Sequence, residues 1–209
     1  MNFQSGNLYH IYNRGNNSQK IFFLEENYSF FLRKVKKELL PHCEIFAYCL
    51  MPTHFHFLVY IGEGATHPTT HRMTGSHPMS ATLAPVPPLN NAIGVLLRSY
   101  TRAINIQEGR TGSLFQQKTK AKCLDSPLLW KNSPPNRYNY PLVCFNYIHQ
   151  NPMMAGRVKK MEDWDFSSFR DYAGMRKETF GGNMSKLNNQ ITNKSQKPNE
   201  KKFKPCSWY

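Results

Sequence analysis

The alternation of apolar and polar residues along the chain predicts strands and helices in a mixed order. Alternation with a period of two is typical of half-buried strands and occurs in these segments: 8–13, 43–50, 54–60 and 114–123. Apolar residues at helical spacing occur in these segments: 25–39, 93–104 and 142–148. Pro41 ends the first helix, and the short Met51-Pro52-Thr53 link predicts a hairpin between the second and third strands.

The resulting order, β-α-β-β-α-β followed by one helix, predicts an α+β fold. It matches a ferredoxin-like split βαβ arrangement, with an antiparallel sheet covered by helices on one face and a further helix at its C-terminal end. We expect residues 1–172 to form one domain. Within it, the segment 61–90 is rich in Pro, Thr, Ser, His and Gly and predicts a long flexible insertion. Residues 173–209 contain many Lys and Asn and few aliphatic residues, which predicts a flexible basic tail.

The net charge of the chain indicates which class of binding partner to expect. The formal net charge is +14 at pH 7, which favours a polyanion such as nucleic acid or an acidic membrane surface. No apolar run approaches the roughly 18 residues that a membrane span needs, and the first residues do not form a signal peptide. The cysteines are odd in number and scattered, with no Cys-x-x-Cys pair. We therefore expect reduced thiols and a cytoplasmic protein.

Two histidines on the third strand are the first candidates for chemistry. His54 and His56 are two residues apart, so on a strand they share one face, while Phe55, Phe57 and Val59 face the other side. Two imidazoles on one face can converge on a divalent cation if another group supplies a third ligand. The alternative is a pair of ordinary half-exposed strand histidines, and the pattern leaves both interpretations open.

A tyrosine and an asparagine form the second candidate. On the last helix, Tyr147 and Asn151 lie one turn apart and face the same region. A phenol that loses its proton can act as a nucleophile, and the Asn151 amide oxygen can supply the missing metal ligand. Pro152 predicts the end of this helix. The alternative is that Tyr147 packs in the core and that Asn151 only precedes the helix stop.

Basic residues at regular spacing are candidates for phosphate contacts. They are Lys118, Lys120 and Lys122 alternating on the fourth strand, Arg14 in a Gly/Asn-rich turn, and Arg98 and Arg102 four residues apart on the second helix. A row of lysines on one strand face suits a phosphate backbone, but it also protects a sheet edge from aggregation. The arginine pair equally suits a solvated helix face.

Taken together, these residues resemble a known family. The segments that carry the resemblance are 9–17 (YHIYNRGNN), 48–54 (YCLMPTH), 147–152 (YIHQNP) and 164–172 (WDFSSFRDY). His54-Phe55-His56 looks like the HUH pair (His, hydrophobic, His), and Tyr147 with Asn151 looks like the single-tyrosine helix of small insertion-sequence transposases. The set as a whole is similar to the REP-associated tyrosine transposases of bacteria.

This resemblance implies a fold, an activity and roles for individual residues. It implies cleavage of single-stranded DNA at hairpins formed by palindromic repeats, with Tyr147 as the nucleophile that forms a 5′-phosphotyrosine. It also implies that His54, His56 and Asn151 hold Mg²⁺ or Mn²⁺. The expected setting is the bacterial cytoplasm, associated with the nucleoid, as a monomer or a homodimer.

Two functions from other classes remain as alternatives. A ferredoxin-like sheet is also the outline of a non-catalytic nucleic-acid-binding module, which would carry aromatic residues on its open face and would not respond to divalent metal. A metal-dependent hydrolase that activates water would cleave DNA without forming a covalent protein–DNA adduct.

Overall fold

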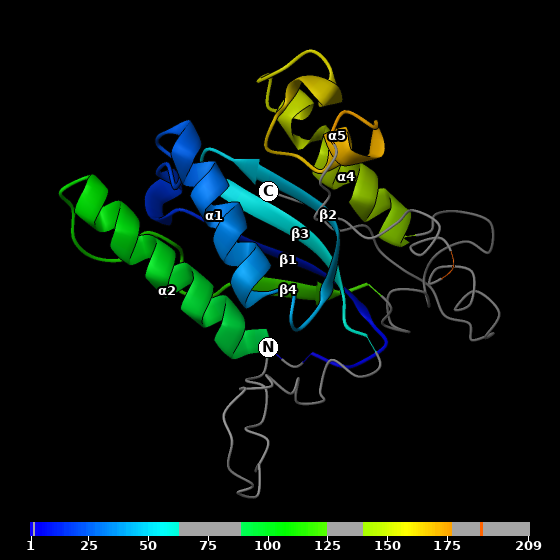
Figure 1. Ribbon diagram of the computed structural model, residues 1–209, viewed down its shortest axis with the longest axis horizontal. Coiled ribbons are helices and arrows are strands. Elements are labelled where there is room, and N and C mark those ends of the chain that lie inside the picture. The colour runs from blue at the N-terminus through cyan, green and yellow to red at the C-terminus, as the bar shows by residue number, and fades with distance from the viewer. Residues whose placement is uncertain (2, 63–88, 125–139, 177–188, 190–209) are drawn as a thin grey trace, which may run out of the picture.

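The strands and helices follow the predicted order (Figure 1). The computed structural model describes residues 1, 3–62, 89–124, 140–176 and 189. Its strands are β1 (Leu8–Arg14), β2 (Glu44–Met51), β3 (His54–Tyr60) and β4 (Lys120–Cys123). Its helices are α1 (Glu25–Glu38), α2 (Leu89–Gln107), α4 (Tyr140–Met154) and α5 (Phe169–Tyr172), with short 3-10 turns η1 (Asn16–Ser18) and η2 (Met161–Asp163). Most of the predicted insertion at 61–90 and of the predicted tail at 173–209 lies outside the described residues.

The sheet confirms the predicted α+β fold. Its strand order is β2-β3-β1-β4, and each neighbouring pair is antiparallel. The units β1-α1-β2 and β3-α2-β4 therefore interleave, since each places one of its strands between the two strands of the other. Helices α1 and α2 cover one face, and α4 packs against the opposite face (Figure 1). The histidine face, expected to be open, is thus partly covered by α4.

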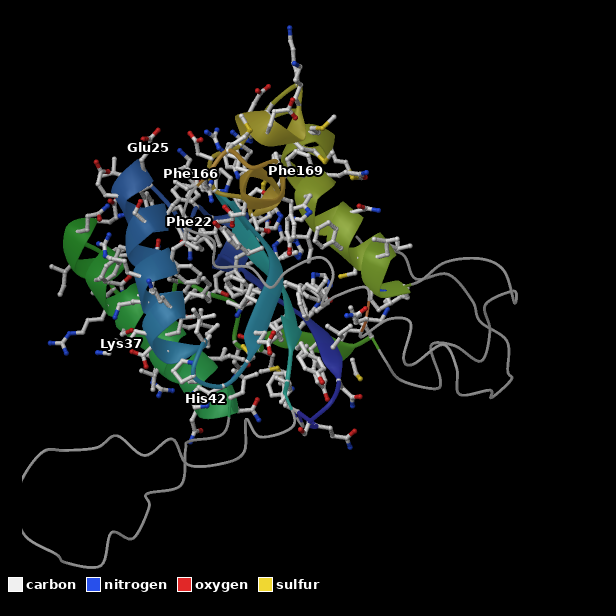
Figure 2. All side chains as sticks on the ribbon, turned by 45° about the vertical axis from the view of Figure 1, so that its right-hand side comes forward. Phe22, Glu25, Lys37, His42, Phe166 and Phe169 are labelled. Atoms are coloured by element: carbon white, nitrogen blue, oxygen red, sulfur yellow. The ribbon has the colours of Figure 1, made fainter. Side chains whose placement is uncertain are left out.

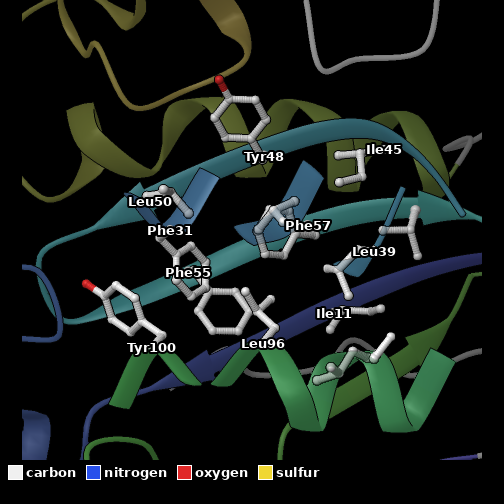
Figure 3. Packing of buried hydrophobic residues seen from close by; sticks show 14 of the residues in the cluster. Ile11, Phe31, Leu39, Ile45, Tyr48, Leu50, Phe55, Phe57, Leu96 and Tyr100 are labelled. Atoms are coloured by element: carbon white, nitrogen blue, oxygen red, sulfur yellow. The ribbon is translucent and has the colours of Figure 1, made fainter. Parts of the chain in front are cut away.

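The larger core lies between the sheet and helices α1 and α2. Aromatic rings dominate it, and Figure 3 shows Phe31, Phe55, Phe57 and Tyr100 facing one another between the layers. The rings of Phe31 and Tyr100 meet edge to face with centroids 4.8 Å apart, a favourable aromatic geometry. The Tyr100 hydroxyl donates a hydrogen bond of 2.7 Å to the Ile21 carbonyl, so its polar group is satisfied inside the core. Burial of these side chains fixes the sheet against the two helices.

Helix α1 is stabilised at both ends by its own sequence. Acidic residues occupy its first turn and basic residues its last turn, which complements the helix dipole. Figure 2 shows Glu25 and Lys37 at opposite ends of this helix. At its start, Asn27 Oδ1 accepts hydrogen bonds of 3.0 Å from the backbone N–H groups of Phe23 and Leu24. The helix therefore starts where the sequence pattern predicts.

The fourth strand is shorter than predicted. The pattern predicted a strand over 114–123, but β4 covers only Lys120–Cys123. Phe115 makes an isolated bridge to Gly15, and the chain then leaves the sheet. The side chain of Asn13 binds the chain where it leaves the sheet: its Nδ2 atom donates to the Gln116 carbonyl at 3.2 Å and to Thr119 Oγ1 at 2.9 Å. The predicted lysine row is therefore broken: Lys118 lies before the strand, and only Lys120 and Lys122 alternate on it.

A segment after α4 covers the outer edge of β2. The backbone N–H of Leu50 donates to the Phe166 carbonyl at 2.9 Å, and the N–H of Ser168 donates to the Tyr48 carbonyl at 3.0 Å. The Ser168 hydroxyl accepts a bond of 2.8 Å from the Tyr48 N–H and lies 2.8 Å from His149 Nε2 on α4. Ser168 thus joins the sheet edge to α4 inside the protein, where it is fully buried.

We predict that Ser168→Ala lowers the free energy of unfolding by about 1–3 kcal/mol, because buried groups of Tyr48 and His149 lose a hydrogen-bond partner. Urea denaturation of the purified protein measures the change. Ser99→Ala is the matched control, since within the described part of the chain Ser99 Oγ donates only to the Leu96 carbonyl of its own helix. The control should stay within about 0.5 kcal/mol of the wild type. Equal stability of Ser168→Ala and wild type would contradict this role.

Candidate active site

The sheet face beneath α4 is divided into an apolar half and a polar half. On the apolar half, Leu8, Leu58 and Tyr60 pack against Cys144, Phe145 and Ile148 of α4. On the polar half, the strand register aligns these antiparallel partners: Tyr12 with His56, Arg14 with His54, Tyr12 with Lys120 and His10 with Lys122. Directly opposed residues share a face, so this register gathers histidines, tyrosine and cations beside α4.

His54 and His56 lie side by side on this polar half. Their ring centroids are 5.1 Å apart and the rings are nearly perpendicular. His54 Nδ1 lies 3.0 Å from Thr53 Oγ1, which leaves its Nε2 atom facing α4. His56 Nδ1 lies 2.9 Å from Nε2 of His10, so the Nε2 atom of His56 is the ring nitrogen that this contact does not use. Each ring is thus held through one nitrogen and presents the other.

Tyr147 and Asn151 share one face of α4, as the helical spacing predicted, and this face meets the histidine pair. The Tyr147 ring meets the His56 ring edge to face, with centroids 5.6 Å apart. One turn later, Asn151 Oδ1 lies 3.5 Å from His54 Nε2, and the Asn151 amide donates to the Tyr147 carbonyl at 3.0 Å. The structure therefore brings together the tyrosine, the asparagine and both histidines from distant parts of the chain.

Pro152 does not end the helix, contrary to the prediction from sequence. Helix α4 continues to Met154, and the N–H of Ala155 still donates to the Asn151 carbonyl at 3.0 Å. Proline removes one backbone donor, which is a small loss this close to the end of a helix. Asn151 therefore lies inside the helix rather than at its end. Its side chain is held one turn from Tyr147 by the hydrogen bond that it donates to the Tyr147 carbonyl.

His10 is a site residue that sequence reasoning did not single out. It is fully buried, bonds to His56 and lies with its ring 6.3 Å from that of Tyr147. Its ring also stacks on Tyr12 at 4.8 Å. The alternation of segment 8–13 placed His10 and Tyr12 on one face, but only the pairing of β1 with β3 shows that this face carries His56.

Burial keeps these histidines neutral. It lowers the pKa of His56 well below the usual value, and a positive charge on His10 or His54 would act in the same direction. Burial, with the charge of Lys122, lowers the pKa of His10 to about 3. Burial also lowers the pKa of His54, although Asn151 partly opposes it. Neutral imidazoles keep a lone pair available for a cation at neutral pH.

A cavity of about 390 Å³ connects these groups and is lined by cations. Arg14, Lys118 and Lys120 line it together with both histidines, Tyr147 and Asn151. Lys122 does not line the cavity; its Nζ atom bonds to the Tyr140 hydroxyl at 2.7 Å. Arg98 and Arg102 lie on α2, away from this cavity. No acidic residue is among the described residues that line it, so the cavity suits an anion.

The donor atoms fit a divalent cation. Within the described ranges, no cluster of three or more His, Cys, Asp or Glu side chains forms a metal site. The available set is therefore two imidazoles and the Asn151 amide oxygen. Two donors that share an ion at about 2.1 Å are about 3 Å apart, close to the 3.5 Å between His54 Nε2 and Asn151 Oδ1. Imidazole suits transition metals such as Zn²⁺, and the amide oxygen suits Mg²⁺ and Mn²⁺.

Comparison with solved structures identifies a protein of the same fold. The match is a structure described as the REP-associated tyrosine transposase bound to a REP hairpin, at a TM-score of 0.56. The chain shares this transposase's fold. The alignment covers 88% of each chain at 16% sequence identity, so the likeness is one of architecture. No family model and no curated protein matches the sequence. No helix in the described part of the chain is long and apolar enough to cross a membrane.

We predict that stability falls below about pH 6.5, because buried histidines resist protonation in the folded state. Burial lowers the pKa of His149 from 6.5 to about 4. Between these values the unfolded chain takes up a proton that the folded chain does not, so acid favours unfolding. His149→Gln should reduce the slope of unfolding free energy against pH by about 1.4 kcal/mol per pH unit in this window. Urea titrations at a series of pH values measure the slope, and an unchanged slope would contradict the assignment.

Proposed function

We propose that this protein is a DNA nuclease and strand transferase that cleaves single-stranded DNA at hairpin-forming repeats through Tyr147. The observation that carries the proposal is the packing of the Tyr147 ring against His56, inside a cavity lined by Arg14, Lys118 and Lys120. The shared fold with a transposase bound to a DNA hairpin supports the same activity.

The proposed reaction is a transfer of one phosphodiester bond. The Tyr147 oxygen attacks the phosphorus, a bond forms between them, and the bond from phosphorus to the 3′ oxygen breaks. The phenol loses its proton, and the departing 3′ oxygen gains one. The products are a 5′-phosphotyrosine and a free 3′-hydroxyl group. Because the ester keeps the phosphodiester linkage, a 3′-hydroxyl can attack it and rejoin a strand without a nucleotide cofactor.

The side chains around Tyr147 have three further proposed roles: binding a metal ion, binding phosphates and orienting a metal ligand. His54, His56 and Asn151 would hold Mg²⁺ or Mn²⁺, and this ion, when bound, draws negative charge from a non-bridging phosphate oxygen. Lys118 and Lys120 would bind neighbouring phosphates, which raises affinity and makes it dependent on salt. His10 would fix the orientation of the His56 ring through the bond between them.

We expect Tyr147→Phe to abolish a covalent adduct between the protein and DNA, because phenylalanine has no oxygen to attack phosphorus. The protein is incubated with an end-labelled DNA hairpin and Mn²⁺, and the products are separated on a denaturing gel. Tyr140→Phe is the matched control: it lies two turns earlier on α4, with its hydroxyl bonded to Lys122. An adduct that survives in Tyr147→Phe would refute the proposal.

The same gel separates the alternative functions. Cleaved DNA without an adduct would indicate a hydrolase that uses water, and binding without cleavage would indicate a nucleic-acid-binding module. The proposal requires an adduct that depends on both Tyr147 and divalent metal.

We predict that His54→Ala and His56→Ala each remove Mn²⁺ binding by the DNA-free protein, because too few donors remain. His10→Ala should weaken Mn²⁺ binding by about 10- to 100-fold, as expected for a group that orients a ligand. Titration followed by the electron paramagnetic resonance of free Mn²⁺ measures the affinity. His42→Ala, just beyond α1, is the control and should bind as the wild type does. Unchanged Mn²⁺ affinity in the His54 and His56 variants would rule out the proposed ligand set.

A further inference from the structure

A second and larger cavity lies between α2 and the chain segment that precedes β4. Its volume is about 1340 Å³, and Arg98, Arg102, Arg110 and Lys118 are among the residues that line it. This volume exceeds the roughly 300–1,000 Å³ of a typical small-molecule pocket. It is therefore large enough for several units of a polymer.

The two cavities share part of their lining. Asn13, Gln116 and Lys118 belong to both the larger cavity and the candidate active site. The shared wall is the place where the chain leaves the sheet, held by the bonds of Asn13 to Gln116 and Thr119. The break in the predicted strand thus moves Lys118 out of the lysine row and into the wall that the two cavities share.

The charges of the larger cavity are all of one sign. No acidic residue is among its described lining residues, and within the described part of the chain none of its arginines forms an ion pair. Gly94 makes room for one of them, because a Cβ atom there would lie 2.8 Å from Nη1 of Arg98. The Arg98 guanidinium therefore folds back along α2 over Gly94, one turn before its own backbone position.

Apolar side chains lie among these cations. Leu97 and Ile106 line the same cavity, and the Ile106 side chain is 74% exposed. Cations beside apolar surface suit a single strand, whose phosphates and unpaired bases can both be bound. A duplex would present mainly its phosphates and sugars to such a surface.

We infer that this larger cavity binds the single-stranded DNA that flanks the cleaved phosphate, and that Lys118 lies at the passage from one site to the other. The inference rests on the proposed function for the identity of the substrate. It gives Arg98 and Arg102 a role in binding the flank, separate from the reaction at Tyr147.

The test compares two DNA hairpins, one blunt and one with a single-stranded flank of about ten nucleotides. Fluorescence anisotropy without divalent metal, so that no cleavage occurs, gives the dissociation constant of each at several salt concentrations. For the double variant Arg98→Ala/Arg102→Ala, we expect the flanked hairpin to bind at least tenfold more weakly and the blunt hairpin to bind as before. The slope of log affinity against log salt should fall by about 1.4, the value for two lost contacts to a single strand.

Two further variants separate the effect of the position of the Arg98 guanidinium from the effect of the protein's net charge. Gly94→Ala keeps every charge but requires the Arg98 guanidinium to move, so it should weaken binding of the flanked hairpin alone and by less than the double variant does. Arg33→Ala/Lys37→Ala removes two cations with the same spacing from α1, and it should leave both affinities unchanged. Equal weakening of both hairpins by Arg98→Ala/Arg102→Ala, or none, would overturn the inference.

The outcomes also distinguish this inference from the proposed function. If flank-dependent binding is lost in Arg98→Ala/Arg102→Ala while an adduct still forms in Tyr147→Phe, the larger cavity binds the flank but the nucleophile is wrong. If the adduct requires Tyr147 and the double variant binds both hairpins normally, the nucleophile is right and the inference is wrong.

Discussion

The antiparallel pairing of β1 with β3 is the constraint on which the candidate active site depends. This register sets Tyr12 opposite His56 and Arg14 opposite His54, and it brings His10 to the same face. A slip of one residue would turn a whole strand over and send its histidines into the aromatic core. The apolar residues of β3, packed under Phe31 and Tyr100, prevent such a slip because they would then face α4. The larger core thus determines where the polar groups lie.

Local patterns in the sequence were enough to predict part of this arrangement. Alternation placed His54 and His56 on one strand face, and helical spacing placed Tyr147 and Asn151 together, because both relations depend only on backbone geometry within one element. The role of His10 depends on the register between two strands, which no local pattern gives. Likewise, the break before β4 arises from Asn13, about a hundred residues earlier in the chain, and a local pattern does not contain that contact.

Burial shapes the chemistry of the polar half of the sheet. Imidazoles beneath α4 lose water, so their neutral forms are favoured and they do not repel one another. The side chains of Arg14, Lys118 and Lys120 lie around them at the exposed rim of the cavity. A neutral set of donors inside a positive rim is suited to placing a metal ion and a phosphate next to each other, since the donors offer lone pairs to the ion and the rim attracts the anion.

The bond between Ser168 and His149 has a further consequence for how the reacting groups are assembled. It fastens α4 to the edge of its own sheet, two residues from Tyr147. The position of the Tyr147 ring against His56 therefore depends on a buried contact at the edge of β2 as well as on the side chains around the ring.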